Sequence, residues 1–200
     1  CELYAMGGVP AERIEEVMGR IASESSRMAT LVEDLLTLAR LDEGRPLEIT
    51  EIDLVKLADN AVFDLQALDP TRTVGLTGIS SRTPPMTLIV PGDRDRISQV
   101  FTNLIGNIVR YTPEGSPVEI ALGRSGNPAI VELRDHGPGI DETDRGRVFE
   151  RFYRADTSRN RKSGGSGLGL AIVSGILPAH KRNASLPKTK RRGLTVRLEL

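Results

Sequence analysis

Several residue types are scarce in this 200-residue chain: tryptophan is absent, aromatic residues make up 4%, and there is one cysteine. The lone Cys1 excludes an internal disulfide and is typical of a reducing compartment, so we expect a cytoplasmic location. No apolar run reaches the roughly 18 residues of a membrane span, so we expect no membrane contact by this chain; any anchor would lie elsewhere in the parent protein. Lys plus Arg equals Asp plus Glu, at 27 each, which argues against a nucleic-acid partner.

The remaining composition is that of a globular protein, with 38% hydrophobic and 27% charged residues. Because aromatic residues are few, the core must be built from Leu, Ile and Val. The chain begins at Cys1 without a methionine, and we expect it to continue upstream. We expect a segment over 1–44 whose helix starts near Ala11, after a turn at residues 7–10, then a linker with a short strand over 45–52 and a larger domain over 53–200.

Apolar residues recur at helical spacing near the start of the chain, and Gly44 with Pro46 ends this segment. Only Glu24 interrupts the stripe, whose members are Ile14, Val17, Met18, Ile21, Met28, Leu31, Val32, Leu35, Leu38 and Leu41. A stripe of about four heptads is more than one helix can bury alone. A core helix of a monomeric domain is the simpler interpretation, but the length of the stripe favours a dimerising helical hairpin.

The rest of the chain alternates between strand and helix patterns, which predicts an α+β fold: an α/β sandwich preceded by the long helix. Asp53 and Asp93 are the expected N-caps of two helices. The expected helices span about 53–68, 93–110, 142–149 and 167–179, and the expected strands are Val74–Leu76, Thr87–Val90, Pro117–Leu122, Ala129–Arg134 and Leu194–Leu200.

Gln99, Asn103 and Asn107 lie at i, i+4 and i+8, and so share one face of a strongly apolar helix. Buried carboxamides cost free energy unless they are hydrogen-bonded, so this row indicates a face that meets a polar ligand. Carboxamide oxygens suit Mg²⁺ that also takes phosphate oxygens. Arg110 and Tyr111 follow, offering a cation for phosphate and a ring to lie against a base. A structural hydrogen-bonding role for the asparagines is the competing interpretation.

Two glycine-rich segments come later in the chain. In Asp135-His136-Gly137-Pro138-Gly139-Ile140 the glycines allow close approach of the backbone to a ligand, and the Asp135 carboxylate can accept from an exocyclic amine. Residues 164–170 (GGSGLGL) open a helix whose N-terminus can bind phosphate, although the lysine of a P-loop is lacking. An ordinary turn and a solvated loop are the competing interpretations.

The order of these segments is more specific than any one of them. The asparagine helix, Asp-x-Gly-x-Gly, the Phe-rich hinge from Phe149 to Phe152 and Gly-x-Gly-Leu-Gly-Leu resemble, in sequence order, the N, G1, F and G2 boxes of sensor histidine kinases, two-component kinases of the GHKL ATPase superfamily. Residues Ser25–Gly44 are similar to the end of their dimerisation and phosphotransfer hairpin. The resemblance implies an ATP-binding catalytic core in which helices and a mixed sheet hold ATP and Mg²⁺ beneath a mobile lid.

The resemblance also implies roles for individual residues. Asn107 would ligate Mg²⁺, Asn103 would line the same site, and Asp135 would bind the adenine amino group. Further nucleotide contacts are implied for Arg110, Tyr111, Gly137, Gly139, Ile140, Arg154, Gly165, Gly167, Leu168, Gly169 and Leu170. The implied partners are a response regulator and a second copy of the chain, joined through the N-terminal helix.

The chain departs from the family at the phosphoryl acceptor. Its two histidines, His136 and His180, both lack the family's acceptor motif. We therefore expect the chain to bind ATP and Mg²⁺ without phosphorylating itself, the acceptor coming from an upstream segment or a second polypeptide. One alternative is an impaired pseudokinase that serves as a dimerisation scaffold; Mg²⁺-dependent ATP binding would favour the kinase core over it. The other is another GHKL ATPase, against which the heptad helix argues.

A second departure follows the last predicted helix, where the family usually has His-Gly-Gly and the chain has His180-Lys181-Arg182-Asn183. That turn requires a positive φ, which Asn183 tolerates better than Lys181 or Arg182. Pro178 also favours an early end to the helix. We therefore expect a strained or poorly ordered connection over 178–193.

Overall fold

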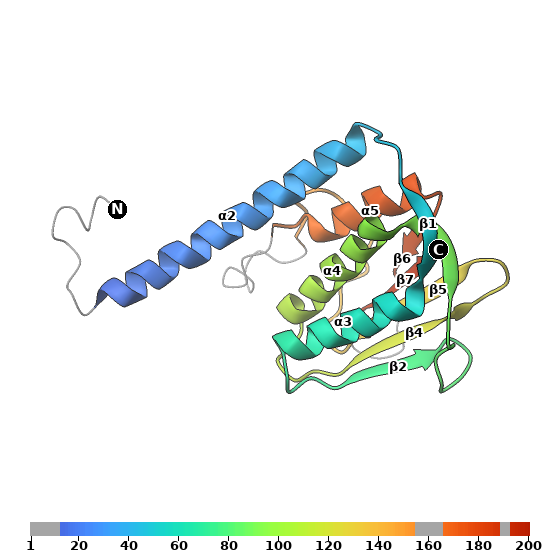
Figure 1. Cartoon of the computed structure of the whole chain (residues 1–200). Coiled ribbons are helices and arrows are strands. Elements are labelled where there is room, and N and C mark those ends of the chain that lie inside the picture. The colour runs from blue at the N-terminus through green and yellow to red at the C-terminus, as the bar shows by residue number, and fades with distance from the viewer. Residues whose placement is uncertain (1–12, 155–165, 189–192) are drawn as a thin grey trace.

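A computed structural model describes residues 13–154, 166–188 and 193–200. The elements in chain order are α2 (Ile14–Asp42), β1 (Ile49–Asp53), α3 (Leu54–Leu68), β2 (Val74–Gly78), β3 (Ile89–Asp93), α4 (Arg94–Tyr111), β4 (Val118–Arg124), β5 (Ala129–Asp135), α5 (Gly169–Ala179), β6 (Asn183–Ser185) and β7 (Thr195–Glu199). Their arrangement confirms the expected α+β class (Figure 1).

The main sheet has five strands in the order β2-β4-β5-β7-β6, with β2 parallel to β4 and the other neighbours antiparallel. Strands β1 and β3 form a separate antiparallel pair. Strand β1 confirms the short strand that was expected within the linker over 45–52. Parallel pairing of β2 and β4 needs a long crossover, which β3 and helix α4 supply.

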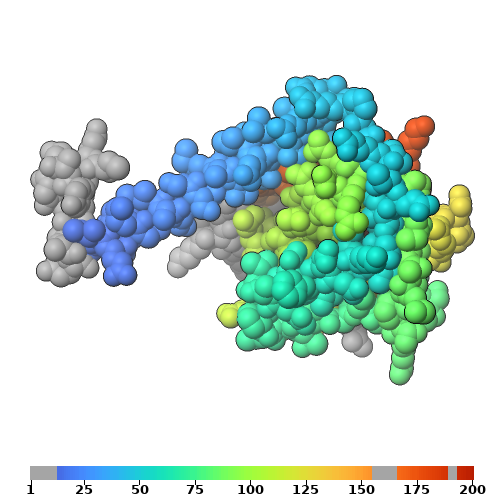
Figure 2. Space-filling view, in the orientation of Figure 1, coloured from blue at the N-terminus to red at the C-terminus, as the bar shows by residue number. Residues whose placement is uncertain are grey.

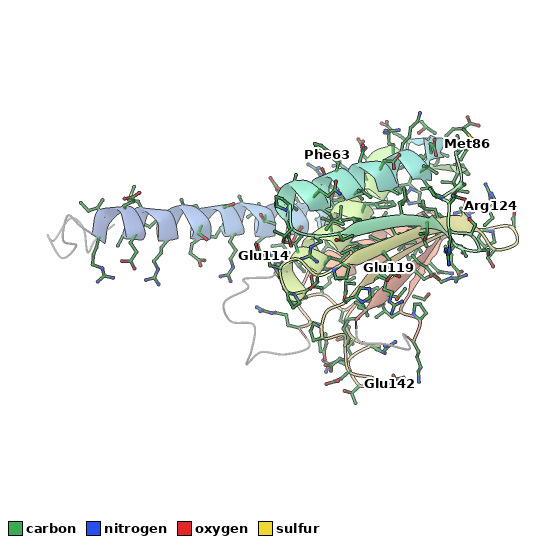
Figure 3. The ribbon with its side chains drawn as sticks, turned by 90° about the horizontal axis from the view of Figure 1, so that it is seen from below. Phe63, Met86, Glu114, Glu119, Arg124 and Glu142 are labelled. Atoms are coloured by element: carbon green, nitrogen blue, oxygen red, sulfur yellow. The ribbon has the colours of Figure 1, made fainter. Side chains whose placement is uncertain are left out.

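Helices α3, α4 and α5 pack beside one another over one face of the main sheet (Figures 1 and 3). Alternate residues of β4 divide between the two faces: Val118 and Ile120 are buried in the core, whereas Glu119 lies on the outer face (Figure 3). On that outer face Glu119 Oε2 lies 3.7 Å from Arg134 Nη1 of β5. The sheet is thus apolar inside and charged outside, the usual pattern for a sheet with one solvated face.

Both predicted N-caps are confirmed. The Asp53 carboxylate accepts from Val55 N at 3.1 Å at the start of α3, and the Asp93 carboxylate accepts from Arg96 N at 3.1 Å at the start of α4. Each satisfies a backbone donor that the first helical turn leaves unpaired.

Helix α2 projects from the rest of the molecule, as Figure 2 shows. Its C-terminal part packs against α5 and buries Thr37 and Leu38. The predicted apolar stripe is otherwise largely exposed in the single chain, with exposed fractions of 65% at Met28 and 53% at Val32. Within the described ranges, no helix combines the length and hydrophobicity that a bilayer span requires.

The expected short helix over 142–149 is wrong, because this segment forms consecutive turns. The Val148 N–H does donate to Asp144 O at 3.0 Å, but the pattern is not continued along the segment. Asp144 is held instead by the Tyr153 hydroxyl, at 2.6 Å. A segment this short cannot offset the cost of helix nucleation without such regular bonds.

The connection after α5 is strained, as expected, and the strain falls on Lys181, whose φ is +57°. Lys181 N donates to Pro178 O at 2.8 Å and Arg182 N donates to Leu177 O at 2.9 Å. These two bonds form a Schellman motif, whose left-handed position normally holds glycine. Pro178 is accommodated inside α5, and Asn183 begins the unpredicted strand β6.

Candidate functional site

Two carboxamides of α4, those of Asn103 and Asn107, lie beside the N-terminus of α5. Asn103 Nδ2 donates to the backbone oxygen of Gln99 at 2.9 Å. A Cβ placed on Gly169 would lie 3.1 Å from Asn103 Oδ1 and 3.5 Å from Asn107 Oδ1. Gly169 therefore allows the start of α5 to approach both asparagines closely. Gln99 points elsewhere: its Nε2 donates to Thr37 Oγ1 of α2 at 3.1 Å.

Asp135 ends strand β5 and organises the loop that follows. Its Oδ1 accepts from Gly137 N at 2.9 Å and from Leu194 N at 3.0 Å. Among the described residues, none donates to its second oxygen, Oδ2. One oxygen thus shapes the loop, and the half-buried carboxylate keeps an acceptor for a ligand donor.

The glycines of this loop are required by close backbone contacts. Gly137 is buried, and a Cβ there would lie 2.9 Å from the methyl carbon of Thr112 and 3.2 Å from Tyr111 O. Gly139 has a φ of +79° and packs on the backbone of Gly193. These contacts bring the Asp135 loop against the C-terminal end of α4.

The predicted site residues divide into two groups that the fold brings near α4. Asn103, Asn107 and Gly169 meet at its middle. Tyr111 and the Asp135 loop meet at its C-terminal end, where Arg110 and Tyr111 are exposed. A polar face and a partly exposed ring are therefore presented along one helix, as an elongated nucleotide would require.

The segment before α5 is closed by a backbone contact between its ends. Phe152 N donates to Gly167 O at 3.2 Å, and a Cβ on Gly167, which has a φ of +72°, would lie 2.9 Å from Tyr153 O. Arg154 follows Tyr153 and is half-buried. Gly165, predicted as a phosphate contact, lies outside the described residues.

Three apolar residues were also predicted to contact the nucleotide. Leu168 is fully buried in the core, so its side chain is committed to packing and only its backbone can serve a ligand. Ile140 and Leu170 are half-buried.

A buried ion pair behind the site was not predicted. Arg72, which is 3% exposed, donates to Asp69 Oδ2 at 3.0 Å, Thr112 Oγ1 at 2.8 Å and Ser116 O at 3.0 Å. It therefore fixes the turn that follows α4, whose first residue contacts Gly137. Asp69 and Arg72 are close in the sequence, but Thr112 and Ser116 lie 40 and 44 residues from Arg72, so no local pattern could have revealed the contacts that tie the pair to this turn.

Both histidines have structural partners. His180 Nε2 accepts from Asp93 N at 3.0 Å, so its Nδ1 carries the proton and donates to Ile176 O at 2.9 Å. His136 Nε2 lies 2.9 Å from a carboxylate oxygen of Glu119 on the outer face of the sheet. These contacts support the expectation that neither ring serves as the phosphoryl acceptor.

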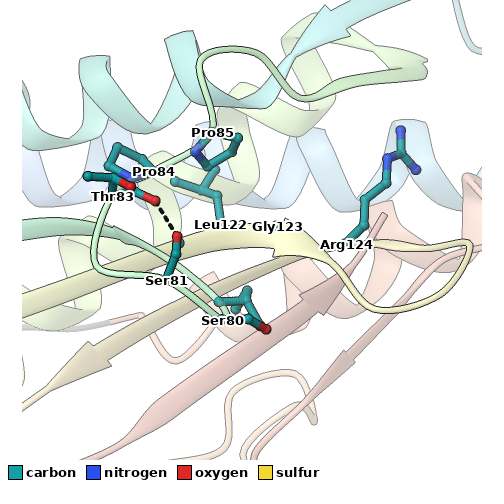
Figure 4. A pocket seen from close by; sticks show the side chains of 10 residues that line it. Ser80, Ser81, Thr83, Pro84, Pro85, Leu122, Gly123 and Arg124 are labelled. Carbon is teal, nitrogen blue, oxygen red and sulfur yellow. Dashed lines mark hydrogen bonds between the residues drawn. The ribbon is translucent and has the colours of Figure 1, made fainter.

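A separate pocket of about 400 Å³ lies at the opposite end of the main sheet (Figure 4). It is lined by Gly78, Ile79, Ser80, Ser81, Thr83, Pro84, Pro85, Leu122, Gly123 and Arg124. The Arg124 guanidinium donates to Asn127 O and Ile89 O, each at 2.9 Å. Because its polar groups bond to nearby backbone and it contains no predicted site residue, this pocket is not the candidate site.

The two asparagines can contribute neutral oxygen ligands to Mg²⁺, whose other ligands would be phosphate oxygens and water. Within the described ranges, no group of three or more His, Cys, Asp or Glu side chains could hold a metal ion. The two asparagine oxygens beside Gly169 are neutral donors of the kind that fit a magnesium ion shared with phosphate oxygens.

Known sensor kinases are similar to this chain in sequence. Probable sensor histidine kinase TcrY of Mycobacterium tuberculosis is 43% identical over 179 residues, 90% of this chain and 37% of that protein. Sensor histidine kinase YkoH of Bacillus subtilis is 36% identical over 194 residues, 96% of this chain and 41% of that protein. The chain thus spans about two fifths of the length of these relatives.

The crystal structure of full-length ShkA in complex with AMPPNP superposes with a TM-score of 0.74 at 25% identity, covering 96% of this chain and 39% of ShkA. These similarities include helix α2 as well as the sheet domain, which does not favour another kind of GHKL ATPase. Residues 92–200 match the family described as histidine kinase-, DNA gyrase B-, and HSP90-like ATPase. The chain belongs to this ATPase family, and the relatives that it matches over most of its length are sensor histidine kinases.

Proposed function

We propose that the chain is the ATP-binding catalytic core of a sensor histidine kinase and acts on a histidine outside its own sequence. The observation that carries the proposal is the meeting of Asn103 and Asn107 with the N-terminus of α5 at the middle of α4, while the Asp135 loop lies at the C-terminal end of the same helix. A triphosphate at the first place and a base at the second would span a single bound nucleotide.

Asp135 Oδ2 would accept from the adenine amino group, while Oδ1 keeps the loop in place. Tyr111 would lie against the base, and Gly137, Gly139 and Ile140 would shape its surroundings. Phosphates would be bound by Arg110, Arg154 and the backbone N–H groups of the Gly165–Leu170 segment, because a helix N-terminus favours anions.

Asn107, with Asn103 beside it, would hold Mg²⁺, which neutralises phosphate charge when bound. The residues of the chain orient the triphosphate so that its terminal phosphoryl group faces an imidazole nitrogen. The bond from the γ-phosphorus to the bridging oxygen of ADP breaks, the lone pair of the unprotonated imidazole nitrogen forms the nitrogen–phosphorus bond, and the other ring nitrogen releases its proton to water. A response-regulator aspartate would then receive the phosphoryl group from the histidine.

Titration calorimetry with ATP and Mg²⁺ tests this assignment. We expect saturable one-site binding that Asn107→Ala weakens at least about tenfold, because a metal ligand is lost. Asn60→Ala is the matched control, since Asn60 is an exposed asparagine within α3. Equal affinities of the two variants for ATP with Mg²⁺ would show that Asn107 does not contribute to the nucleotide site.

A further inference from the structure

Helix α2 is held to the ATP-binding domain by side chains from three turns. Asp34 Oδ2 accepts from Ser166 Oγ at 3.0 Å, Thr37 Oγ1 accepts from Gln99 at 3.1 Å, and Asp42 pairs with both guanidinium nitrogens of Arg151 at 2.6 and 2.9 Å. Between them, Leu38 is buried against the domain. The contact is thus a defined docked arrangement of α2 on the domain.

Asp34 differs from the other α2 residues that contact the domain, because its partner Ser166 lies in the segment predicted to bind the phosphates of the nucleotide. Ser166 Oγ also accepts from Leu168 N at 3.2 Å, immediately before α5, and α5 has no side-chain cap of its own. The half-buried Asp34 carboxylate therefore adds negative charge next to the positive end of α5. Burial raises its pKa, while the positive charge of Arg110, another predicted phosphate contact, acts in the opposite direction.

We propose that Asp34 competes with the terminal phosphates of the nucleotide for Ser166, the N-terminus of α5 and Arg110, so that docking of α2 and binding of a triphosphate oppose each other. This inference rests on the proposed function, and it adds a regulatory contact that the proposed phosphotransfer does not require. When α2 is docked, the Asp34 carboxylate already interacts with the same Ser166 hydroxyl, helix N-terminus and Arg110 charge that would stabilise a bound phosphate. Two anions in the same partly desolvated region repel each other more strongly than in bulk water.

Thermodynamic linkage makes this opposition reciprocal. Triphosphate binding favours release of α2 by the same factor by which docking weakens triphosphate binding. ADP, which lacks the terminal phosphoryl group, should be affected less than ATP. Binding of a triphosphate would thereby change the fraction of chains in which α2, the helix with the apolar stripe, is docked on the domain.

The variant Asp34→Asn separates charge from hydrogen bonding, because asparagine can still accept from Ser166. We expect it to lower the dissociation constant of ATP with Mg²⁺ at least about fivefold, a typical coupling between two sites, and that of ADP by less. Glu33→Gln is the matched control, since Glu33 is the exposed neighbour on α2 and loses the same charge. Calorimetry on the full 200-residue chain measures the dissociation constants of ATP and ADP for the unmodified chain and for both variants.

A second variant weakens docking without touching the predicted nucleotide contacts. Leu38→Ala removes the buried apolar anchor of α2 and should also tighten ATP binding, because less docked protein competes. Circular dichroism confirms that the domain remains folded.

If Asp34→Asn binds ATP no more tightly than Glu33→Gln, or more weakly than the unmodified chain, the proposal is overturned. An unchanged ATP affinity in folded Leu38→Ala also overturns it. Failure of the unmodified chain to bind ATP would instead contradict the proposed function, so the two failures are distinguishable.

Discussion

At the scale of single residues, Arg72 is the buried charge on which the turn behind the site depends. Because Arg72 is 3% exposed and its guanidinium bonds to Asp69 and Thr112, replacement leaves the Asp69 carboxylate buried without its cation. We predict that Arg72→Met lowers the free energy of unfolding by about 3 kcal/mol. Urea unfolding followed by circular dichroism measures the loss. The exposed Arg82 provides the control Arg82→Met, which should unfold like the unmodified chain, and equal losses in both would contradict this role.

The Asp69 carboxylate, which pairs with Arg72, should make the stability of the chain depend on pH. The hydrogen bond from Thr71 Oγ1, followed by that from Gly115 N and the charge of Arg72, holds the pKa of Asp69 below its ordinary value. A pKa lowered by folding adds stability above the unfolded-state value, and this stability is lost as the pH falls through the folded-state value. Asp69→Asn should therefore destabilise the chain at neutral pH and approach the unmodified chain in acid. A destabilisation that stays constant with pH would contradict this prediction.

Residue patterns in the sequence predicted those candidate site residues that a single segment marks by its own spacing. Asn103 and Asn107 share a helical face, and Asp135 lies at the end of a strand before a glycine-rich loop, so spacing alone was enough to propose them as ligand contacts. Asp34 and Ser166 meet across 132 positions, and such a contact depends on how α2 docks. No periodicity within either segment encodes that docking.

At the scale of elements, the end of α5 stores strain that can be removed. Lys181 is exposed and occupies the left-handed position of the Schellman motif. We predict that Lys181→Gly raises the free energy of unfolding by about 1 kcal/mol, because glycine adopts this conformation without steric cost. Thermal or urea unfolding detects the gain. Lys181→Ala retains the Cβ and should bring no gain; the same gain in both variants would contradict a backbone cause.

Element boundaries could be predicted where a side chain marks them. Asp53 and Asp93 fixed the starts of α3 and α4, and the apolar periodicity fixed their course. The turns over 142–149 and the short strand β6 escaped prediction, because β6 pairs only with β7 and the turns depend on bonds such as that between Tyr153 and Asp144.

At the scale of the whole molecule, the exposed stripe of α2 predicts self-association. Met28 lies in that stripe, and a charge there would be buried without a partner in a helical dimer. We predict that Met28→Glu shifts the chain toward monomer in sedimentation experiments. Arg20→Glu, on the exposed helix outside the stripe, should leave the association unchanged; a chain that is monomeric at every concentration would contradict the prediction.

The missing acceptor gives a prediction about catalysis. Because both histidines are held in structural contacts, the chain incubated with ATP labelled in the γ-phosphate should stay unlabelled. The measurement is acid-labile label retained on the protein after gel separation. Stable label at His136 or His180 would contradict the assignment of the acceptor to another segment.

The central claim is that an adenine nucleotide binds with its amino group on Asp135, and it is tested most directly by comparing ATP with inosine triphosphate, which lacks that group. We predict that the chain binds ATP at least about tenfold more tightly, as expected for a hydrogen bond to a charged acceptor. Asp135→Asn should abolish that preference while keeping the loop bonds of Oδ1. Equal affinity of the unmodified chain for both triphosphates, or no binding of either, would contradict the account.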